Sequence, residues 1–337
     1  MSASESRPAV QARGLVKSFG DVRALDGVDI DVPAGTVLGL LGPNGAGKTT
    51  VVRILSTVIE PDAGEASVMG LDVVRDAALV RARIGLAGQF AAVDGNLTGR
   101  ENLLLIGALT HLPRRAIGPR ADELLAQFGL SEAAGRPVRT YSGGMRRRLD
   151  LAAALVHRPP VLYLDEPTTG LDPASRSDLW DTVRNLVAGG TTVLLTTQYL
   201  EEADLLADRI VVIDRGGALA EGTAAELKRR LGGTVLELTI LDDAQALRAA
   251  DILDRLELGR VAREGRTLRV NVNDGTRALI AAVRALDAED IEPAAAAVRE
   301  PSLDDVFLAL TGRRAEPETE STDEAADARG REKEVVA

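Results

Sequence analysis

The chain has 337 residues, of which 45% are hydrophobic and 27% charged, fractions typical of a globular protein that can bury a sizeable core. Its formal net charge of −11 and its 2% of aromatic residues argue against a nucleic-acid ligand, because phosphate backbones are bound by clustered lysine and arginine. Cysteine is absent, which excludes disulfides, thiol nucleophiles and cysteine-ligated metals and suits a reducing compartment.

The sequence offers no candidate for a membrane span. No run approaches the roughly 20 consecutive apolar residues that a membrane-spanning helix needs, and residues 1–8 lack the basic start and apolar core of a signal peptide. If the protein acts at a membrane, we expect a separate protein to cross it. At the other end, residues 315–337 hold eight acidic and three basic residues without periodicity, so 313–337 are predicted to be an acidic disordered tail.

The first predicted domain spans residues 8–230. Short apolar runs alternate there with helical patterns, as in an α/β protein with a parallel sheet. The runs at 36–41, 161–164, 193–196 and 210–213 are continuous and apolar, which is typical of strands covered by helices on both faces. Residues 98–127 have helical spacing with polar interruptions, so we expect a helical insertion at about 90–145.

The second predicted domain spans residues 231–312. Leu236, Leu238 and Ile240 alternate with polar residues, a helical stretch covers 244–256, and a second alternating strand follows at 268–272. With a further helix at 277–286 and an apolar run at 294–298, the order is close to β-α-β-β-α-β. We therefore predict a small accessory α+β domain of the ferredoxin-like type, and it carries no recognisable catalytic cluster.

A phosphate-binding loop follows the strand at 36–41 and precedes a helical pattern at 50–58. The pattern G-x-x-x-x-G-K-[ST] is specific when strand and helix flank it in this order. Lys48 is predicted to reach the β- and γ-phosphates, and Thr49 to offer its hydroxyl to Mg²⁺. Only four of the 40 basic residues are lysines, so lysine here is informative, because a compact ammonium fits a cradle of amides. The predicted nucleotide-binding residues of the loop are Gly42, Pro43, Asn44, Gly45, Ala46, Gly47, Lys48, Thr49 and Thr50.

The apolar strand at 161–164 ends in two carboxylates, Asp165 and Glu166. Ligands of α/β sheets bind at the carboxyl ends of the strands, so Asp165 is predicted to serve Mg²⁺ and Glu166 to orient and polarise the attacking water. Taken alone, such a pair is typical of a strand that enters a charged surface loop. The phosphate loop elsewhere in the chain favours the catalytic interpretation.

The segment Tyr141-Ser142-Gly143-Gly144-Met145 opens a helical stretch at 145–157, and a serine before glycines is by itself an ordinary helix N-cap. Together with the phosphate loop and the acidic strand end, it resembles the signature of the ABC ATPase family, in which Leu-Ser-Gly-Gly-Gln is usual. Tyr141 and Met145 depart from that pattern, whereas the Ser-Gly-Gly core is intact. The resemblance implies that Ser142, Gly143 and Gly144 contact the γ-phosphate held by a second copy of the chain, through a hydroxyl, backbone N–H groups and the helix dipole.

Other family elements follow from the same resemblance. Gln89 matches the glutamine loop, which touches Mg²⁺ or water and links to the transporter. Asp172 matches the loop that meets the opposite subunit, although it is an equally good helix N-cap before Pro173. Phe19 matches the aromatic residue that stacks on adenine, with a core phenylalanine as the alternative. Gln198 stands where most members carry histidine, and it can donate a hydrogen bond to the γ-phosphate but cannot become cationic.

Three segments narrow the resemblance to one branch. Thr-Thr-Gln-Tyr-Leu at 196–200, Tyr-Ser-Gly-Gly-Met-Arg at 141–146 and Pro-Ser-Leu-Asp-Asp-Val-Phe at 301–307 resemble the daunorubicin and doxorubicin resistance branch of exporter ATPases, up to about Gly312. The resemblance implies an α/β P-loop NTPase cassette with a parallel core sheet, an antiparallel β subdomain and a helical subdomain. The accessory domain follows it.

The same resemblance implies a function. A homodimer of this subunit is expected to hydrolyse MgATP and to drive export of a hydrophobic drug, natural product or lipid. Separate integral membrane permease subunits are expected to bind that substrate and to hold the homodimer at the cytoplasmic face of the cell membrane.

Two alternatives stay open. A soluble ABC-type ATPase that acts on ribosomes, DNA or chromosomes generally has two cassettes in one chain, a long coiled coil, zinc-binding cysteines or basic arms, and this sequence shows none of them. A weakly hydrolysing nucleotide switch is suggested by Gln198 and Met145. Lys48, Asp165 and Glu166 argue against that switch.

Overall fold

We describe a computed structural model of the chain, which covers residues 8–88, 93–230 and 233–311. The predicted acidic tail at 313–337 and the predicted loop residue Gln89 lie outside these residues. Contacts between residues divide the chain into two compact units, one that ends at Glu221 and one that begins at Gly222. The first unit contains two sheets and two hydrophobic clusters, and the second contains one sheet and one cluster.

The first unit opens with an antiparallel sheet in the order β2-β1-β4-β5. Val10, Ala12 and Leu15 are fully buried. Val10 and Ala12 follow the alternation of a strand, and a register shift after Ala12 keeps Leu15 buried as well. The strands are β1 (Val10–Phe19), β2 (Val22–Val32), β4 (Ala63–Val68) and β5 (Leu71–Asp72).

The core sheet of the first unit has the order β10-β9-β3-β8-β7-β6, and its pairs from β9 to β6 are parallel. Every residue of β3, β7 and β8 is buried, as continuous apolar runs predict. The strands are β3 (Val37–Leu41), β6 (Ile84–Ala87), β7 (Val161–Asp165), β8 (Thr192–Thr197), β9 (Arg209–Asp214) and β10 (Gly217–Gly222).

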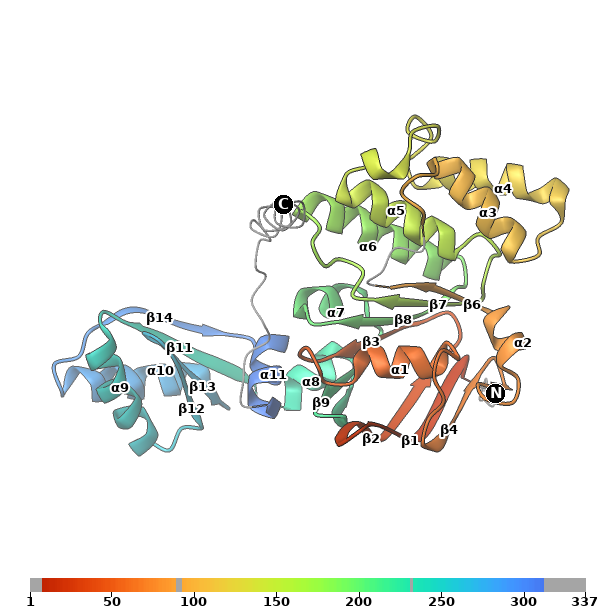
Figure 1. Ribbon diagram of the computed structural model, residues 1–337. Helices are drawn as coiled ribbons and strands as arrows, with labels where there is room; N and C mark the ends of the chain where they lie inside the picture. The colour runs from red at the N-terminus through yellow and green to blue at the C-terminus, as the bar shows by residue number, and fades with distance from the viewer. Residues whose placement is uncertain (1–7, 89–92, 231–232, 312–337) are drawn as a thin grey trace, which may run out of the picture. The chain divides into compact units, whose positions relative to one another are not determined.

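Helices cover both faces of this core sheet (Figure 1). Val161 and Tyr163 of β7 join the core that contains α1, whereas Leu162 and Leu164 join the core of α3 to α6. The helices are α1 (Lys48–Leu55), α2 (Ala77–Arg81), α3 (Gly99–Leu109), α4 (Arg114–Gln127), α5 (Gly143–Ala154), α6 (Pro173–Ala188) and α7 (Leu200–Leu206). The predicted class, an α/β cassette with antiparallel and helical parts, is confirmed.

The second unit is an antiparallel sheet in the order β12-β13-β11-β14 with helices packed on one face. Leu236, Leu238 and Ile240 bury their side chains against α9 and α10 together with the alternating residues of β13. The elements are α8 (Ala224–Arg230), β11 (Thr234–Ile240), α9 (Asp243–Arg255), β12 (Val261–Glu264), β13 (Thr267–Val272), α10 (Gly275–Asp287), β14 (Pro293–Arg299) and α11 (Leu303–Thr311).

The boundary between the units differs from the prediction. The sequence pattern placed it at residue 231, because the first clear break in periodicity is the glycine pair at 232–233. In the structure α8 belongs to the second unit, where it contacts α11. The second unit therefore begins before the glycine pair that marks the boundary in the sequence pattern.

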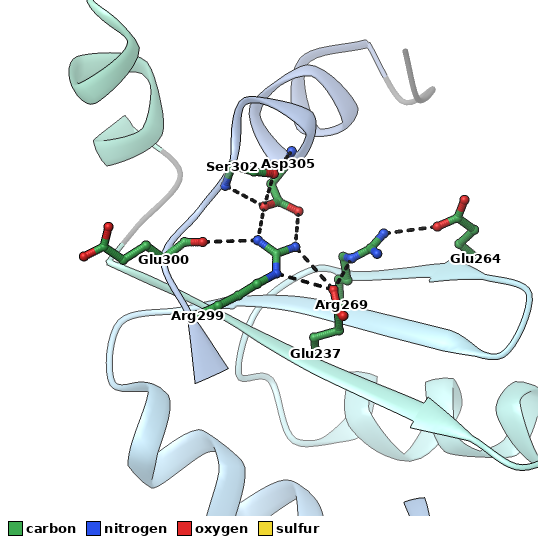
Figure 2. A network of polar contacts seen from close by, with 7 residues as sticks. All are labelled: Glu237, Glu264, Arg269, Arg299, Glu300, Ser302 and Asp305. Atoms are coloured by element: carbon green, nitrogen blue, oxygen red, sulfur yellow. Dashed lines mark hydrogen bonds and ion pairs between the residues drawn. The ribbon is translucent and has the colours of Figure 1, made fainter. Parts of the chain in front are cut away.

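An ion-pair network lies on the other face of the second sheet (Figure 2). Arg299 of β14 donates to both carboxylate oxygens of Asp305 at 2.6 and 3.0 Å and to Glu237 at 3.3 Å. Arg269 donates to the same Glu237 at 2.6 Å. Because Asp305 belongs to the first turn of α11, the network joins that helix to β11, β13 and β14.

Candidate functional site

The phosphate loop, Gly42 to Gly47, connects the end of β3 to the start of α1, and its glycines are structural requirements. Gly45 and Gly47 have φ angles of 78° and 109°, which side chains rarely adopt. A Cβ at Gly42 would lie 2.2 Å from the carbonyl oxygen of Ile213, and one at Gly47 2.6 Å from that of Ala24. Only glycine lets this backbone turn so close to its neighbours.

Lys48 is the first residue of α1, and its side chain is almost completely buried. Its Nζ donates to the carbonyl oxygens of Gly42 at 2.7 Å and Pro43 at 3.1 Å. The same Nζ lies 3.4 Å from Oε1 of Glu166. The loop cation and the carboxylate predicted to activate water therefore meet, although 118 positions separate them in sequence.

Asp165 and Thr49 place two oxygen atoms side by side at the end of β7. The Thr49 hydroxyl is 3.3 Å from Oδ1 of Asp165. Thr196 of β8 also donates its hydroxyl to Oδ1 of Asp165. A hydroxyl and a carboxylate are the oxygen ligands that Mg²⁺ prefers beside phosphates, so these side chains fit the ion.

Glu166 has a left-handed backbone, with φ at 50°. A non-glycine residue in this conformation costs of order 1–3 kcal/mol and persists only where its surroundings fix it. Here its N–H donates to the carbonyl oxygen of Thr196 at 3.0 Å and to the Thr196 hydroxyl at 3.1 Å. Thr196 therefore anchors both carboxylate residues to the neighbouring strand.

The signature segment begins α5. Ser142 is its N-cap, and the Ser142 hydroxyl accepts a hydrogen bond from the Met145 N–H at 3.2 Å. Ser142 and Gly143 are exposed. A Cβ at Gly144 would lie 2.6 Å from the Ser175 hydroxyl, so this glycine allows close contact between the starts of α5 and α6.

Asp172 is the N-cap of α6 and accepts hydrogen bonds from the Ser175 N–H at 2.9 Å and hydroxyl at 2.7 Å. These bonds lower the pKa of Asp172. The local interpretation of Asp172 as a helix cap is confirmed, and its predicted contact with a second subunit stays a prediction.

The two remaining described site residues lie outside the cluster around Lys48. Phe19 ends β1 with its ring 47% exposed, which excludes the alternative of a core phenylalanine, and Lys17 Nζ lies 5.8 Å from the ring centroid. Gln198 follows β8, and its buried Oε1 accepts no hydrogen bond. An amide oxygen is an acceptor, so its partner would have to be a donor such as water, whereas a phosphate oxygen would be met by the Gln198 NH2 group.

Sequence reasoning missed three polar residues behind the cluster. They are Thr196, Arg147 and Glu202. Thr196 belongs to the segment 196–200 that carries the resemblance, but no role is predicted for it there, and Arg147 and Glu202 belong to none of the motifs. Burial raises the pKa of Glu202, whose Oε1 accepts a hydrogen bond from Trp180 Nε1 at 3.2 Å. Glu202 gives no sequence signal, because acidic residues are favourable in the first turn of a helix and Glu201 beside it has the same character.

The geometry defines a P-loop nucleotide hydrolase with an ABC-type signature helix, and comparison with known proteins gives the same class. Residues 25–169 match the ABC transporter family. The chain is 57% identical to a daunorubicin resistance ATP-binding protein of Streptomyces coeruleorubidus, over 90% of this chain and 96% of that protein. It is 50% identical to the daunorubicin/doxorubicin resistance ATP-binding protein of Streptomyces peucetius, over 95% of this chain and 96% of that protein.

A solved structure also resembles the first unit. It is a dimeric ATP-binding cassette in a post-hydrolysis state with ADP and Pi, 25% identical with a TM-score of 0.59, and the match covers 64% of this chain and 98% of that one. The chain therefore belongs to the ABC transporter family of ATP-binding proteins. Within that family it belongs to the daunorubicin/doxorubicin resistance ATP-binding proteins, and it is an ATP hydrolase.

Among the described residues, no helix combines the length and the apolar character that crossing a bilayer requires. ATP-binding subunits of this family generally work with separate membrane permease subunits.

Proposed function

We propose that two copies of this chain close around two MgATP molecules and that hydrolysis drives export of a hydrophobic drug, natural product or lipid through a separate permease at the cytoplasmic face of the membrane. The single observation that carries the catalytic part is the meeting of Lys48 with Glu166 at 3.4 Å beside the Thr49–Asp165 pair.

The site residues have separate roles in this proposal. Lys48 and the loop amides bind the phosphates, while Thr49 and Asp165 hold Mg²⁺. When bound, Mg²⁺ neutralises charge that develops on the phosphate oxygens. Glu166 orients the attacking water, and Gln198 donates a hydrogen bond to the γ-phosphate.

The dimer is supported by the exposed signature. Ser142 and Gly143 open α5 toward solvent, where backbone N–H groups and the helix dipole favour a phosphate. The similar cassette noted above was solved as a dimer with ADP and Pi. We propose that the signature of one copy completes the site of the other.

The permease and the cargo are proposed from the named relatives, which confer daunorubicin or doxorubicin resistance. From the same resemblance, we propose that the permease rather than this chain binds the cargo. The direction of transport is tested by drug efflux in cells that express both subunits.

The catalytic proposal predicts a large loss of activity in Glu166→Gln. The variant keeps size and polarity but cannot accept a proton, so we expect kcat for MgATP to fall by about 100-fold or more with little change in ATP affinity. Phosphate release by the purified chain, with and without the permease, measures this. Glu221→Gln, an exposed carboxylate in β10, serves as control. An unchanged kcat in Glu166→Gln would rule out the proposed role.

A further inference from the structure

Arg147 lies on α5, five residues after Ser142, and only 14% of its side chain is exposed. Its Nε donates to the carbonyl oxygen of Pro167 at 2.7 Å, and its Nη1 donates to that of Gly88. Its Nη2 lies 3.5 Å from the carbonyl oxygen of Asp165. One guanidinium on the signature helix thus contacts three backbone carbonyls from two other segments.

These carbonyls lie at functional positions. Asp165 and Pro167 are the residues immediately before and after Glu166, the residue with the left-handed backbone. Gly88 follows β6 at the edge of the core sheet. Arg147 therefore joins the helix that carries the signature to the backbone on both sides of the proposed water-activating carboxylate.

The neighbouring arginines do not share this position. Arg146 is exposed, and Arg148 donates to the carbonyl oxygen of Phe128 at 3.3 Å. Of the three consecutive arginines, only the middle one reaches the end of β7. A planar fork of donors can bind several carbonyls at once, which a lysine ammonium on a flexible stem cannot do with the same geometry.

Burial makes this placement costly for a cation. It lowers the pKa of Arg147, and the carboxylates of Asp150, Glu202 and Asp165 oppose that effect. Asp150, one turn along α5, is 3.3 Å away and almost completely buried. A buried ion pair of this kind is weak support for stability, so a role in positioning is the more economical explanation.

Glu166 has open space on one side. It lines a cavity of about 210 Å³ together with Gly143, Arg147 and Asp150. Only 7% of the Glu166 side chain is exposed, and Lys48 Nζ lies 3.4 Å from its carboxylate. The position of the carboxylate therefore depends on Lys48 and on the backbone that carries Glu166. That backbone is fixed by Thr196 on one side and by Arg147 on the other.

We propose that Arg147 is a positioning residue for hydrolysis, which fixes the backbone around Glu166 relative to the signature helix. A displacement of α5 is then transmitted to the hydrolytic carboxylate within the same chain. The inference rests on the proposed role of Glu166 and adds to it a residue that acts through Glu166.

The test uses Arg147→Lys and Arg147→Met in the full chain. The matched control is Arg120→Met, because Arg120 is similarly buried and donates to two backbone carbonyls, those of Leu155 and Val156, outside the site. We expect kcat for MgATP to fall at least tenfold in both Arg147 variants, while binding of a fluorescent ATP analogue changes less than about threefold. Arg120→Met is expected to retain wild-type kcat. The fluorescence of Trp180, the only tryptophan, shows whether each variant is folded.

A double-mutant cycle separates positioning from a general structural role. If Arg147 acts through Glu166, Arg147→Lys in a Glu166→Gln background lowers the single-turnover rate no further. Additive losses, or an equal loss of ATP affinity and kcat, would overturn the inference. If wild-type hydrolysis did not depend on Glu166 at all, the proposed function itself would fail. If Glu166→Gln abolished hydrolysis while the Arg147 variants kept wild-type kcat, only the positioning role would be refuted.

Discussion

Thr196 links the two carboxylate residues that the sequence presents as neighbours. Its hydroxyl accepts from the Glu166 N–H and donates to Asp165, from a strand 30 residues further along the chain. A serine or threonine hydroxyl can make both bonds because it is a donor and an acceptor. The orientation of the carboxylates is therefore set by β8 as well as by β7.

Thr196→Val removes the hydroxyl at nearly constant volume. We expect the free energy of unfolding to fall by about 1–2 kcal/mol, because the buried Asp165 oxygen loses a donor, and kcat to fall by about tenfold. Urea unfolding followed by Trp180 fluorescence and steady-state phosphate release measure the two effects. The control is Thr192→Val on the same strand, whose hydroxyl accepts from the Gly35 N–H at 2.9 Å. It should lose stability but not kcat, and an equal loss of kcat there would contradict the assignment.

Gln198 leaves the site without the imidazole titration that a histidine at this position would contribute. Because an amide does not titrate, the hydrolysis rate should show no break near pH 6–7 that depends on residue 198. Gln198→His should introduce one. The measurement is a pH–rate profile of wild type, Gln198→His and Gln198→Ala. A wild-type break in that range that disappears in Gln198→Ala would contradict the sensor role of the amide.

At the scale of elements, α11 is held to its sheet by charge rather than by apolar packing alone. Burial favours the neutral form of Asp305, but hydrogen bonds from Arg299 and Ser302 outweigh it and lower the pKa of Asp305 below its ordinary value of 3.8. The stabilisation is therefore present above pH 3.8 and is lost as the pH falls through the lowered pKa.

Asp305→Asn tests this attachment. At pH 7 we expect the free energy of local opening of α11 and β14 to fall by about 1–2 kcal/mol. This value takes into account that Arg299 is partly exposed. Hydrogen exchange of the full chain, read by mass spectrometry, reports on the second unit, which contains no tryptophan. The difference in opening free energy between Asp305→Asn and wild type should stay constant between pH 7 and 5 and become smaller below pH 3.8. Glu289→Gln, which breaks an exposed pair with Arg248, should have little effect.

At the scale of the whole molecule, the proposal needs two copies. The chain has no cysteine, so introduced cysteines are unique reporters. In a Glu166→Gln background, Asn44→Cys of the phosphate loop and Ser142→Cys of the signature should be joined between copies by a short thiol crosslinker when ATP is present. Gel electrophoresis detects the linked dimer. Tight ATP binding by a strictly monomeric chain that never forms this product would refute the shared site.

Much of the fold could be predicted because its signals are local. The phosphate loop lies between a strand and a helix in sequence. The runs at 37–41 in β3 and 161–164 in β7 are continuous and buried on both faces. The alternation of Leu236, Leu238 and Ile240 likewise predicted a half-buried strand. The boundary at Gly222 could not be predicted, since α8 belongs to the second unit through its contact with α11, which lies about 75 residues further along the chain.

The residue types proposed to bind phosphate and Mg²⁺ can be predicted from the chain alone, because a Gly-rich turn, a lysine and a strand that ends in carboxylates are each encoded within a few positions. Folding is needed to bring Lys48 within 3.4 Å of Glu166 and to place Thr196 and Arg147 against the backbone around Glu166. The physical reason is that parallel strands β3, β7 and β8, distant in sequence, bring their carboxyl ends to one edge of the sheet, and no local pattern records which side chains meet there.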